Sequence, residues 1–283
     1  MEITHSYEGL ARKYYRIRRG TPRFAAFIVS HAGFDKNRRN RPLTIVELGV
    51  GSGQQTEFVE KYLNAAGFHN YRILACDKSY QSDSHYGPAQ LNLLMDRINK
   101  GEISERVVPV QLDFDGFTLP LESASVDLSY MAWVLHHLKD QQGVLNEIAR
   151  ITRKGARHFM YQVTMEDLEN HPLDRYFPSK YEYDARRYPT RSQLKRMFES
   201  AGFTFEKPYA IKRDDPKLID RVFLESIENT SFDSALRMIK DDDPLAFAEG
   251  VERVRKEVER AEVSGNYRTY YHNRRKVFWG IKQ

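Results

Sequence analysis

Cysteine is almost missing from this sequence of 283 residues, since Cys76 is the only one. A lone cysteine excludes an intramolecular disulfide and a cysteine-rich zinc cluster. Apolar runs long enough to span a membrane are missing too. The first 20 residues lack the apolar segment of a secretory signal, so we expect a cytoplasmic protein. Histidines and acids do not fall at metal-ligand spacings, so no metal site is predicted.

Positive charge is concentrated at one end of the chain. The net charge is +5, and residues 1–42 hold ten Lys or Arg against three Asp or Glu. A basic end can contact nucleic acid, an anionic substrate or a membrane surface, or it can be a solvated helix face. Because no RNA-binding motif accompanies the charge, nucleic acid is not the expected partner. Nothing in the sequence predicts the oligomeric state.

Apolar stretches alternate with amphipathic ones through the middle of the chain. Helical spacing is present at 56–67, 88–101 and 141–155. Buried-strand composition is present at 44–50, 71–77, 106–114, 125–134 and 157–163. This alternation predicts an α/β fold with a parallel sheet that is covered on both faces, doubly wound and Rossmann-like. Two later stretches, 204–213 and 275–282, bring the mostly parallel sheet to seven strands.

A glycine-rich loop follows the first predicted strand, in the stretch "ELGVGSG" from Glu47 to Gly53. Its glycines are Gly49, Gly51 and Gly53, so the third is misplaced for the dinucleotide pattern G-x-G-x-x-G. No Gly-Lys-Ser/Thr follows, and the loop has no lysine to meet a triphosphate. The loop therefore predicts a ligand that approaches bare backbone and tolerates a nearby acid.

Two further acids stand at the ends of the next two predicted strands. Asp77 ends the second strand and Asp113 ends the third, where Phe114 follows it. Together with the loop they resemble motif I and the neighbouring strand ends of class I S-adenosylmethionine (SAM) dependent methyltransferases. The resemblance implies that Glu47 and the three loop glycines contact SAM, and that Asp77 accepts its ribose hydroxyls. It also implies that Asp113 and Phe114 contact the adenine.

The resemblance continues in "VDLSYMAWVLHHLKD" and "VLNEIARITRKG", which are similar to methyltransferases of ubiquinone biosynthesis and natural-product pathways. It covers residues 44–163 and departs from the family after Asp77, where "KSYQSDSHYGPAQ" is longer and more polar than usual. Met131 is expected beside the cofactor and Trp133 beside the acceptor. The family often places N-terminal helices over SAM, which puts Tyr15 near the cofactor and Tyr14 near the substrate.

Four segments are expected from these patterns. Residues 43–163 form the SAM-binding core, and residues 191–283 complete it with a helical insertion at about 216–264. Residues 1–42 form an N-terminal helical cap, as the resemblance implies. Residues 164–190 are polar and rich in tyrosine, and a long connection at this edge of a sheet can form a lid.

The acceptor chemistry is expected to involve the histidine pair and the lid. His136 and His137 follow the fourth strand, at the edge where ligands bind, and one of them can serve as a base or orient the acceptor. Tyr176, Tyr181 and Tyr183 of the lid are expected to line an apolar pocket. Three lid arginines, Arg175, Arg186 and Arg187, can instead hold a carboxylate or remain solvated.

Four functions fit these residues. The first is methyl transfer to oxygen, nitrogen or carbon of a small-molecule metabolite or natural-product intermediate. The second is attack at the aminocarboxypropyl carbon of SAM, which releases methylthioadenosine without methyl transfer. The third is an RNA methyltransferase that uses the basic N-terminus. The fourth is a SAM-binding module without turnover.

Overall fold

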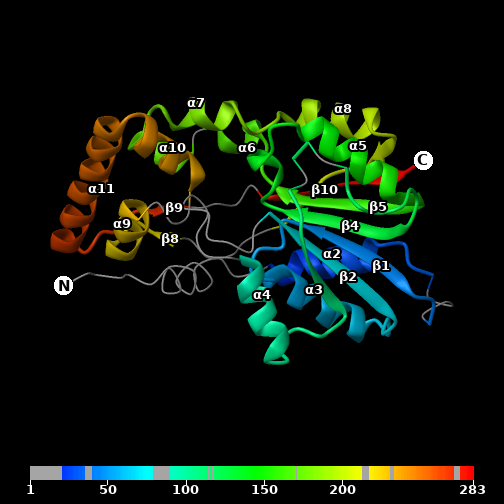
Figure 1. The fold of residues 1–283 in the computed structure, drawn as a ribbon. Coiled ribbons are helices and arrows are strands. Elements are labelled where there is room, and N and C mark those ends of the chain that lie inside the picture. Colours follow the sequence, from blue (N-terminus) through cyan, green and yellow to red (C-terminus); the bar gives the residue numbers. More distant parts are fainter. Residues whose placement is uncertain are drawn as a thin grey trace. The chain divides into compact units, whose positions relative to one another are not determined.

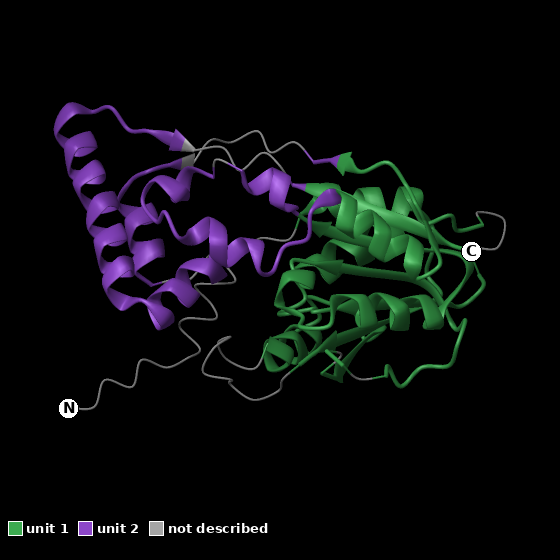
Figure 2. Ribbon diagram, turned by 90° about the horizontal axis from the view of Figure 1, so that it is seen from above, with its two compact units in different colours: residues 1–162, 192–209, 276–283 green, residues 163–191, 210–275 purple. Residues whose placement is uncertain are grey.

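The computed structural model describes residues 21–35, 40–78, 90–113, 115–116, 118–169, 171–211, 217–229, 233–270 and 275–283. The chain divides into two compact units (Figure 2). Unit 1 comprises residues 1–162, 192–209 and 276–283, and unit 2 comprises residues 163–191 and 210–275. In the described part of the chain, no helix is long and apolar enough to cross a membrane.

Unit 1 is built on one sheet with the strand order β3-β2-β1-β4-β5-β10-β6, and the short β7 also pairs with β10. The five strands from β3 to β5 are parallel, whereas β10 runs antiparallel to β5 and β6. The strands are β1 (Leu43–Leu48), β2 (Tyr71–Asp77), β3 (Val107–Gln111), β4 (Val126–Ala132), β5 (Thr152–Gln162), β6 (Phe203–Phe205), β7 (Tyr209–Ala210) and β10 (Lys276–Lys282). The predicted fold class, a mostly parallel doubly wound sheet, is confirmed.

Helices cover both faces of this sheet (Figure 1). One face carries α2 (Pro22–His31), α3 (Gln54–Ala65) and α4 (Gln90–Asn99), and the other carries α5 (Gln141–Ile151) and α8 (Arg191–Ser200). Leu145 of α5 and Phe198 of α8 lie fully buried in one apolar cluster with Leu48 and Met160 of the sheet. On the opposite face, α2 packs aromatic rings against β4 and β5, as described below.

Two predicted elements, one helix and one strand, have different bounds in the structure. The helix expected at 141–155 ends at Ile151, because the chain enters β5 directly at Thr152. The expectation of a helix through Gly155 was therefore wrong. The strand expected at 204–213 is divided into β6 and β7, with Pro208 between them. Pro109 lies in β3, an edge strand, where a residue without an N–H is tolerated.

Unit 2 is helical and is assembled from two separate segments of the chain. The first contributes α6 (Met165–Leu168), a 3-10 turn (Pro172–Arg175) and α7 (Lys180–Ala185). The second contributes β8 (Lys217–Leu218), α9 (Arg221–Glu228), α10 (Ser234–Asp242), α11 (Pro244–Ser264) and β9 (Thr269–Tyr270). Asp243 caps α11 by accepting from the Ala246 N–H at 3.0 Å, and Pro244 follows it at the first helical position.

Both segments of unit 2 share one apolar cluster, in which Phe177 packs against α11. A Cβ atom placed on Gly250 of α11 lies 2.2 Å from Cε1 of Phe177. That distance is far below any real contact, so the ring occupies the space that a side chain would need. Glycine in a helix interior costs roughly 1 kcal/mol relative to alanine. Here the close approach of the ring explains why it is present.

We predict that Gly250→Ala destabilises the protein by about 1–3 kcal/mol, because overpacking against Phe177 outweighs the gain in helix propensity. Urea unfolding of the variant and the parent protein measures the difference. Glu249→Ala is the matched control, since the neighbouring Glu249 side chain is 72% exposed and its loss should change stability by less than about 0.5 kcal/mol. A more stable Gly250→Ala variant would contradict the packing described here.

Candidate functional site

The glycine loop leaves β1 at the carboxyl edge of the sheet and is hydrogen-bonded to β2. The N–H groups of Gly49 and Val50 donate to the Cys76 carbonyl at 2.8 and 3.1 Å. All three glycines of the motif have positive φ, between 55° and 77°. A Cβ on Gly49 would lie 2.2 Å from Cγ2 of Val134, and one on Gly53 would lie 2.6 Å from Cδ1 of Leu94. These two glycines are therefore required by packing as well as by backbone conformation.

Gly51 differs from its two neighbours in the motif. A Cβ placed on it would lie 3.7 Å from Oε1 of Gln90, an ordinary contact distance, so packing does not require glycine here. Its N–H donates to Oδ2 of Asp77 at 2.7 Å, and the other Asp77 oxygen accepts from the Lys78 N–H at 2.8 Å. Burial raises the pKa of Asp77, and these two N–H groups oppose the shift. The carboxylate that ends β2 is thereby fixed directly beside the backbone of the glycine loop.

An arginine of α4 holds the loop from the other side. Arg97 is buried and donates from Nη1 to the Ser52 carbonyl at 3.0 Å. Its remaining nitrogens pair with Glu57 at 2.6 Å and Glu102 at 3.0 Å. Sequence analysis missed Arg97. The available signal was an arginine on the same helical face as Leu94, where an apolar residue would ordinarily stand.

Glu47, the acid of the motif, is buried, with 2% of its surface exposed. Its Oε2 atom accepts from the Thr56 hydroxyl at 2.5 Å and from the Tyr130 hydroxyl at 2.7 Å. Desolvation raises the pKa of this carboxyl from 4.5 to about 7, although the two hydroxyls lower it. Thr56 and Tyr130 were not predicted to belong to the site. The predicted contact between Glu47 and a ligand stays a prediction.

Asp113 lies beside Asp77 at the carboxyl edge, as their positions on neighbouring strands predicted. The Leu112 N–H donates to the Asp77 carbonyl at 2.8 Å, and Lys78 Nζ lies 3.4 Å from Oδ2 of Asp113. The Asp113 carboxylate is 38% exposed. Phe114, the other predicted adenine contact, lies outside the described residues. The two acids are thus close enough to meet different parts of one ligand.

A third acid ties the loops of this edge together. Asp115 accepts from the backbone N–H groups of Lys139 and Asp140 at about 3 Å, which joins the loop after β3 to the loop after β4. Asp140 in turn caps α5 by accepting from the Gly143 N–H at 2.8 Å. Loops held in this way keep their backbone groups in place before a ligand arrives.

The end of β4 places Trp133 in a strained conformation, with φ at +63°. Left-handed backbone is unfavourable for a bulky residue, and such strain is frequent at functional sites. The Trp133 N–H donates to the Tyr161 carbonyl at 3.0 Å, and the two rings meet edge to face at 5.6 Å. Met131, two residues earlier, is fully buried in the apolar cluster on the α5 side.

The histidine pair follows in a 3-10 turn, Leu135–His137. His136 is buried and His137 is exposed, and their ring centroids lie 3.9 Å apart. The Trp133 ring lies 6.4 Å from the His136 ring. The structure therefore brings Trp133 and His136 together at the edge that also carries the glycine loop.

Helix α2 extends this aromatic group from the opposite direction. Phe24 stacks on Tyr161 at 5.0 Å and meets the Tyr130 ring edge to face at 6.4 Å. The start of α2 is fixed to α3, because the Thr21 N–H donates to the Gln55 side chain at 2.9 Å. Tyr14 and Tyr15, predicted near the substrate and the cofactor, lie outside the described residues.

The three tyrosines predicted to bind the acceptor belong to unit 2 and differ in environment. Tyr176 is buried in the apolar cluster of the unit, and burial together with Glu257 raises its pKa to about 12. Tyr181 is 41% exposed. Tyr183 is partly buried and carries the Arg186 guanidinium over its ring at 5.0 Å. Tyr183 packs against the cluster that contains Tyr176, and the role of all three tyrosines stays a prediction.

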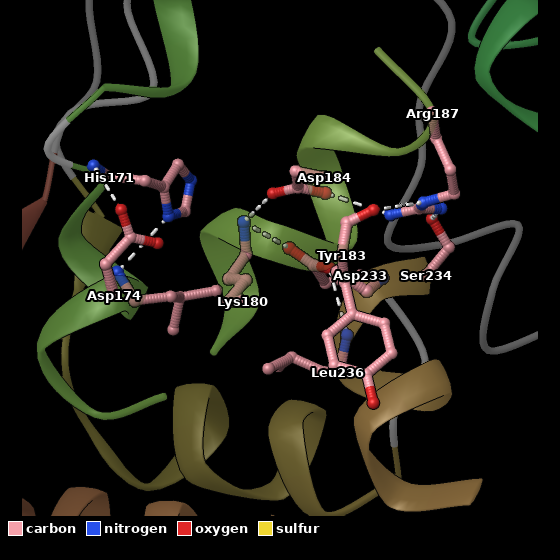
Figure 3. A network of polar contacts seen from close by, with 11 residues as sticks. His171, Asp174, Lys180, Tyr183, Asp184, Arg187, Asp233, Ser234 and Leu236 are labelled. Atoms are coloured by element: carbon pink, nitrogen blue, oxygen red, sulfur yellow. Dashed lines mark hydrogen bonds and ion pairs between the residues drawn. The ribbon is translucent and has the colours of Figure 1, made fainter. Parts of the chain in front are cut away.

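Beside these tyrosines, unit 2 contains a buried network of charges (Figure 3). Lys180 Nζ lies 2.5 Å from Oδ2 of Asp184 and 3.7 Å from Oδ2 of Asp233. Arg187 donates to Asp184 at 2.9 Å and to the Ser234 hydroxyl at 2.7 Å. One of the lid arginines is therefore engaged within the unit. The network connects α7 of the first segment to α10 of the second.

Comparison with known proteins agrees with this geometry. Residues 46–160 match a family profile described as a methyltransferase domain. They form a methyltransferase domain of the class I SAM-dependent superfamily. The chain thus contains a methyltransferase domain, and SAM is the cofactor of that superfamily. A search of curated proteins gave no match.

Solved structures of low sequence identity share the fold. A presumptive methyltransferase from an antibiotic biosynthesis pathway of Anabaena variabilis has a TM-score of 0.60 at 14% identity, over 92% of this chain and 96% of that one. The YcgJ protein of Bacillus subtilis has a TM-score of 0.56 at 13% identity, over 92% and 97%. Phosphoethanolamine N-methyltransferase 2 of Haemonchus contortus has a TM-score of 0.54 at 15% identity, over 99% of this chain and 58% of that one.

The raised pKa of Glu47 predicts a specific pH dependence of stability. The unfolded carboxyl titrates near 4.5 and the folded one near 7, so the folded protein binds the additional proton between these values. Its contribution to stability is complete below the lower value and is lost as the pH rises through the upper one. Relative to Glu47→Gln, the ligand-free parent protein should lose about 2–3 kcal/mol between about pH 5 and about pH 8. Urea unfolding at both pH values tests this, and equal pH slopes would contradict it.

Proposed function

We propose that SAM binds at the carboxyl ends of β1, β2 and β3, with its methionine part against the glycine loop. Asp77 accepts the ribose hydroxyls and Asp113 accepts from the adenine amino group. The single observation that supports this placement best is the pairing of the Asp77 carboxylate with the Gly51 N–H, which fixes the carboxylate directly against the glycine loop. A ligand that needs both a carboxylate and bare backbone fits there.

The charges at this edge fit a cationic ligand. SAM carries an ammonium and a sulfonium but no phosphate, so the acids near the loop are favourable. A cation above the loop stabilises the ionised form of Glu47, whose pKa is about 7 in its absence. Glu47 then supplies negative charge near the loop while its Oε2 atom still accepts from the Thr56 and Tyr130 hydroxyls. SAM binding and ionisation of Glu47 are therefore coupled.

We infer that the reaction is methyl transfer to a small-molecule acceptor. Transfer from a sulfonium is an in-line displacement, for which the protein mainly supplies alignment and exclusion of water. Trp133 provides an aromatic wall at the end of β4, and His136 or His137 orients the acceptor or accepts its proton. The Haemonchus relative, which was crystallised with phosphomonomethylethanolamine, and the Anabaena relative of an antibiotic pathway support a small acceptor.

Product analysis tests the reaction directly. The purified protein is incubated with SAM alone, with SAM and a small-molecule cell extract, and with SAM and total tRNA, and both nucleoside by-products are measured by mass spectrometry. We expect S-adenosylhomocysteine only in the arm with the small-molecule extract. Methylthioadenosine in the arm without an acceptor would contradict methyl transfer. S-adenosylhomocysteine only with tRNA would contradict the small-molecule acceptor.

Substitution of Asp77 tests the placement of SAM. Asp77→Ala removes the proposed ribose contacts and the partner of the Gly51 N–H, so SAM affinity measured by calorimetry should fall at least about tenfold. Asp77→Asn keeps an oxygen for the Gly51 N–H and should weaken binding less. Asp96→Ala is the control, because Asp96 is an exposed acid on α4. Unchanged SAM affinity in Asp77→Ala would show that the cofactor binds elsewhere.

A further inference from the structure

Gln162, the last residue of β5, is fully buried, yet neither polar atom of its amide has a hydrogen-bond partner. In the part of the chain that the structure describes, no other buried side chain leaves both of its polar atoms unpaired. Leaving a buried amide unpaired costs a large part of its desolvation free energy. A methionine of similar shape would avoid that cost. The amide therefore requires an explanation other than packing.

The position of Gln162 supplies that explanation, because it lies at the carboxyl edge of the sheet. Ala132 of β4 pairs with Tyr161 of β5, and the Trp133 N–H donates to the Tyr161 carbonyl. Gln162 thus stands next to Trp133 at the ends of two adjacent strands. The glycine loop leaves β1, which neighbours β4 on its other side. Two strand spacings of about 4.8 Å place Gln162 about 10 Å from the loop, within reach of a small acceptor.

Two other buried polar residues show that this pattern is specific to Gln162. His158 also has one unpaired nitrogen, but its other nitrogen contacts the Ser129 hydroxyl at 2.9 Å and its ring packs near Phe198 and Phe203. It lies well inside β5, away from the edge. Gln55 is also a buried amide, but its oxygen has a hydrogen-bond partner because it accepts from the Thr21 N–H. Among the residues that the structure describes, only Gln162 combines an unsatisfied amide with a position at the ligand edge.

We propose that the Gln162 amide binds the methyl acceptor and that the methylated atom is a nitrogen or oxygen that carries hydrogen. This inference rests on the proposed function. The amide oxygen accepts a hydrogen bond from the N–H or O–H of the acceptor, which directs a lone pair of that atom toward the methyl carbon. The amide N–H₂ donates to a second oxygen or nitrogen of the same molecule.

The transfer is balanced without another reactant. The lone pair of the nitrogen or oxygen forms the bond to the methyl carbon, the carbon–sulfur bond breaks, and its electrons remain on sulfur in S-adenosylhomocysteine. The proton of the acceptor passes to solvent. Gln162 cannot take that proton, because an amide is not a base at neutral pH. A carbon acceptor offers no such hydrogen bond.

The experiment compares Gln162→Met with the parent protein in three measurements. Thermal unfolding should show an unchanged or higher midpoint, because the substitution removes an unpaired buried amide. SAM affinity measured by calorimetry should stay within about twofold. Methyl transfer to the small-molecule extract, followed with SAM that carries a ¹³C-methyl group, should fall at least about tenfold at limiting extract.

Gln55→Met is the matched control for stability. It removes an amide that is satisfied by Thr21, so its unfolding midpoint should fall, in contrast to that of Gln162→Met. Gln162→Leu serves as a second variant, so that the result does not depend on the fit of one side chain. The carbon chemical shift of the ¹³C-methyl product distinguishes methyl on nitrogen or oxygen from methyl on carbon.

Each result decides between the interpretations. The inference is supported if methyl transfer is lost while stability and SAM affinity are unchanged, and if the product carries the methyl group on nitrogen or oxygen. A lower unfolding midpoint in both Gln162 variants, unchanged transfer, or methyl on carbon overturns it while the proposed function stands. A parent protein that binds SAM but methylates nothing in the extract overturns the small-molecule function, and this inference with it.

Discussion

The hydrogen bond from the Gly51 N–H to the Asp77 carboxylate connects the two strand ends on which the ligand edge depends. It is possible only because the loop turns sharply after β1, with three residues at positive φ. Arg97 fixes the same loop from α4 through the Ser52 carbonyl. A loop with bonds on both sides pays little ordering entropy when a cofactor arrives. Together these contacts hold the loop in place beside the Asp77 carboxylate.

The buried carboxyl of Glu47 shows how this edge tolerates an acid beneath a backbone loop. Two hydroxyl donors satisfy Oε2, but burial still raises its pKa to about 7. Without a cation the group is close to its point of half-protonation at neutral pH, so the ionised form is available at small cost. A permanently neutral residue would give no electrostatic attraction to a sulfonium. A fully ionised buried acid would cost more stability in the absence of ligand.

Most of the fold could be predicted from local patterns. The periods of strands and helices, the glycines that end helices and the acids at strand ends are each visible within a short stretch of sequence. Neighbouring residues at strand ends, such as Asp77 and Asp113, could be placed because parallel strands end at one edge. Contacts between distant elements could not be foreseen in this way. The Arg97 contact with the loop depends on how α4 packs, and the burial of Tyr176 depends on helices some 70 residues later. The positive φ of Trp133 likewise arises from tertiary structure, since nothing about tryptophan favours it.

The polar groups buried in the two units have opposite character, and the contrast separates structure from function. In unit 2, Lys180, Asp184 and Asp233 are paired with one another across two segments that are distant in sequence. Removing one partner of such a network leaves an uncompensated charge, so it specifies how the segments associate. In unit 1, the Gln162 amide has no such partner within the described chain. The Gln162 amide does not hold elements of the fold together, and it lies at the edge where a ligand is proposed to bind. A contact with that ligand is therefore the best explanation for it.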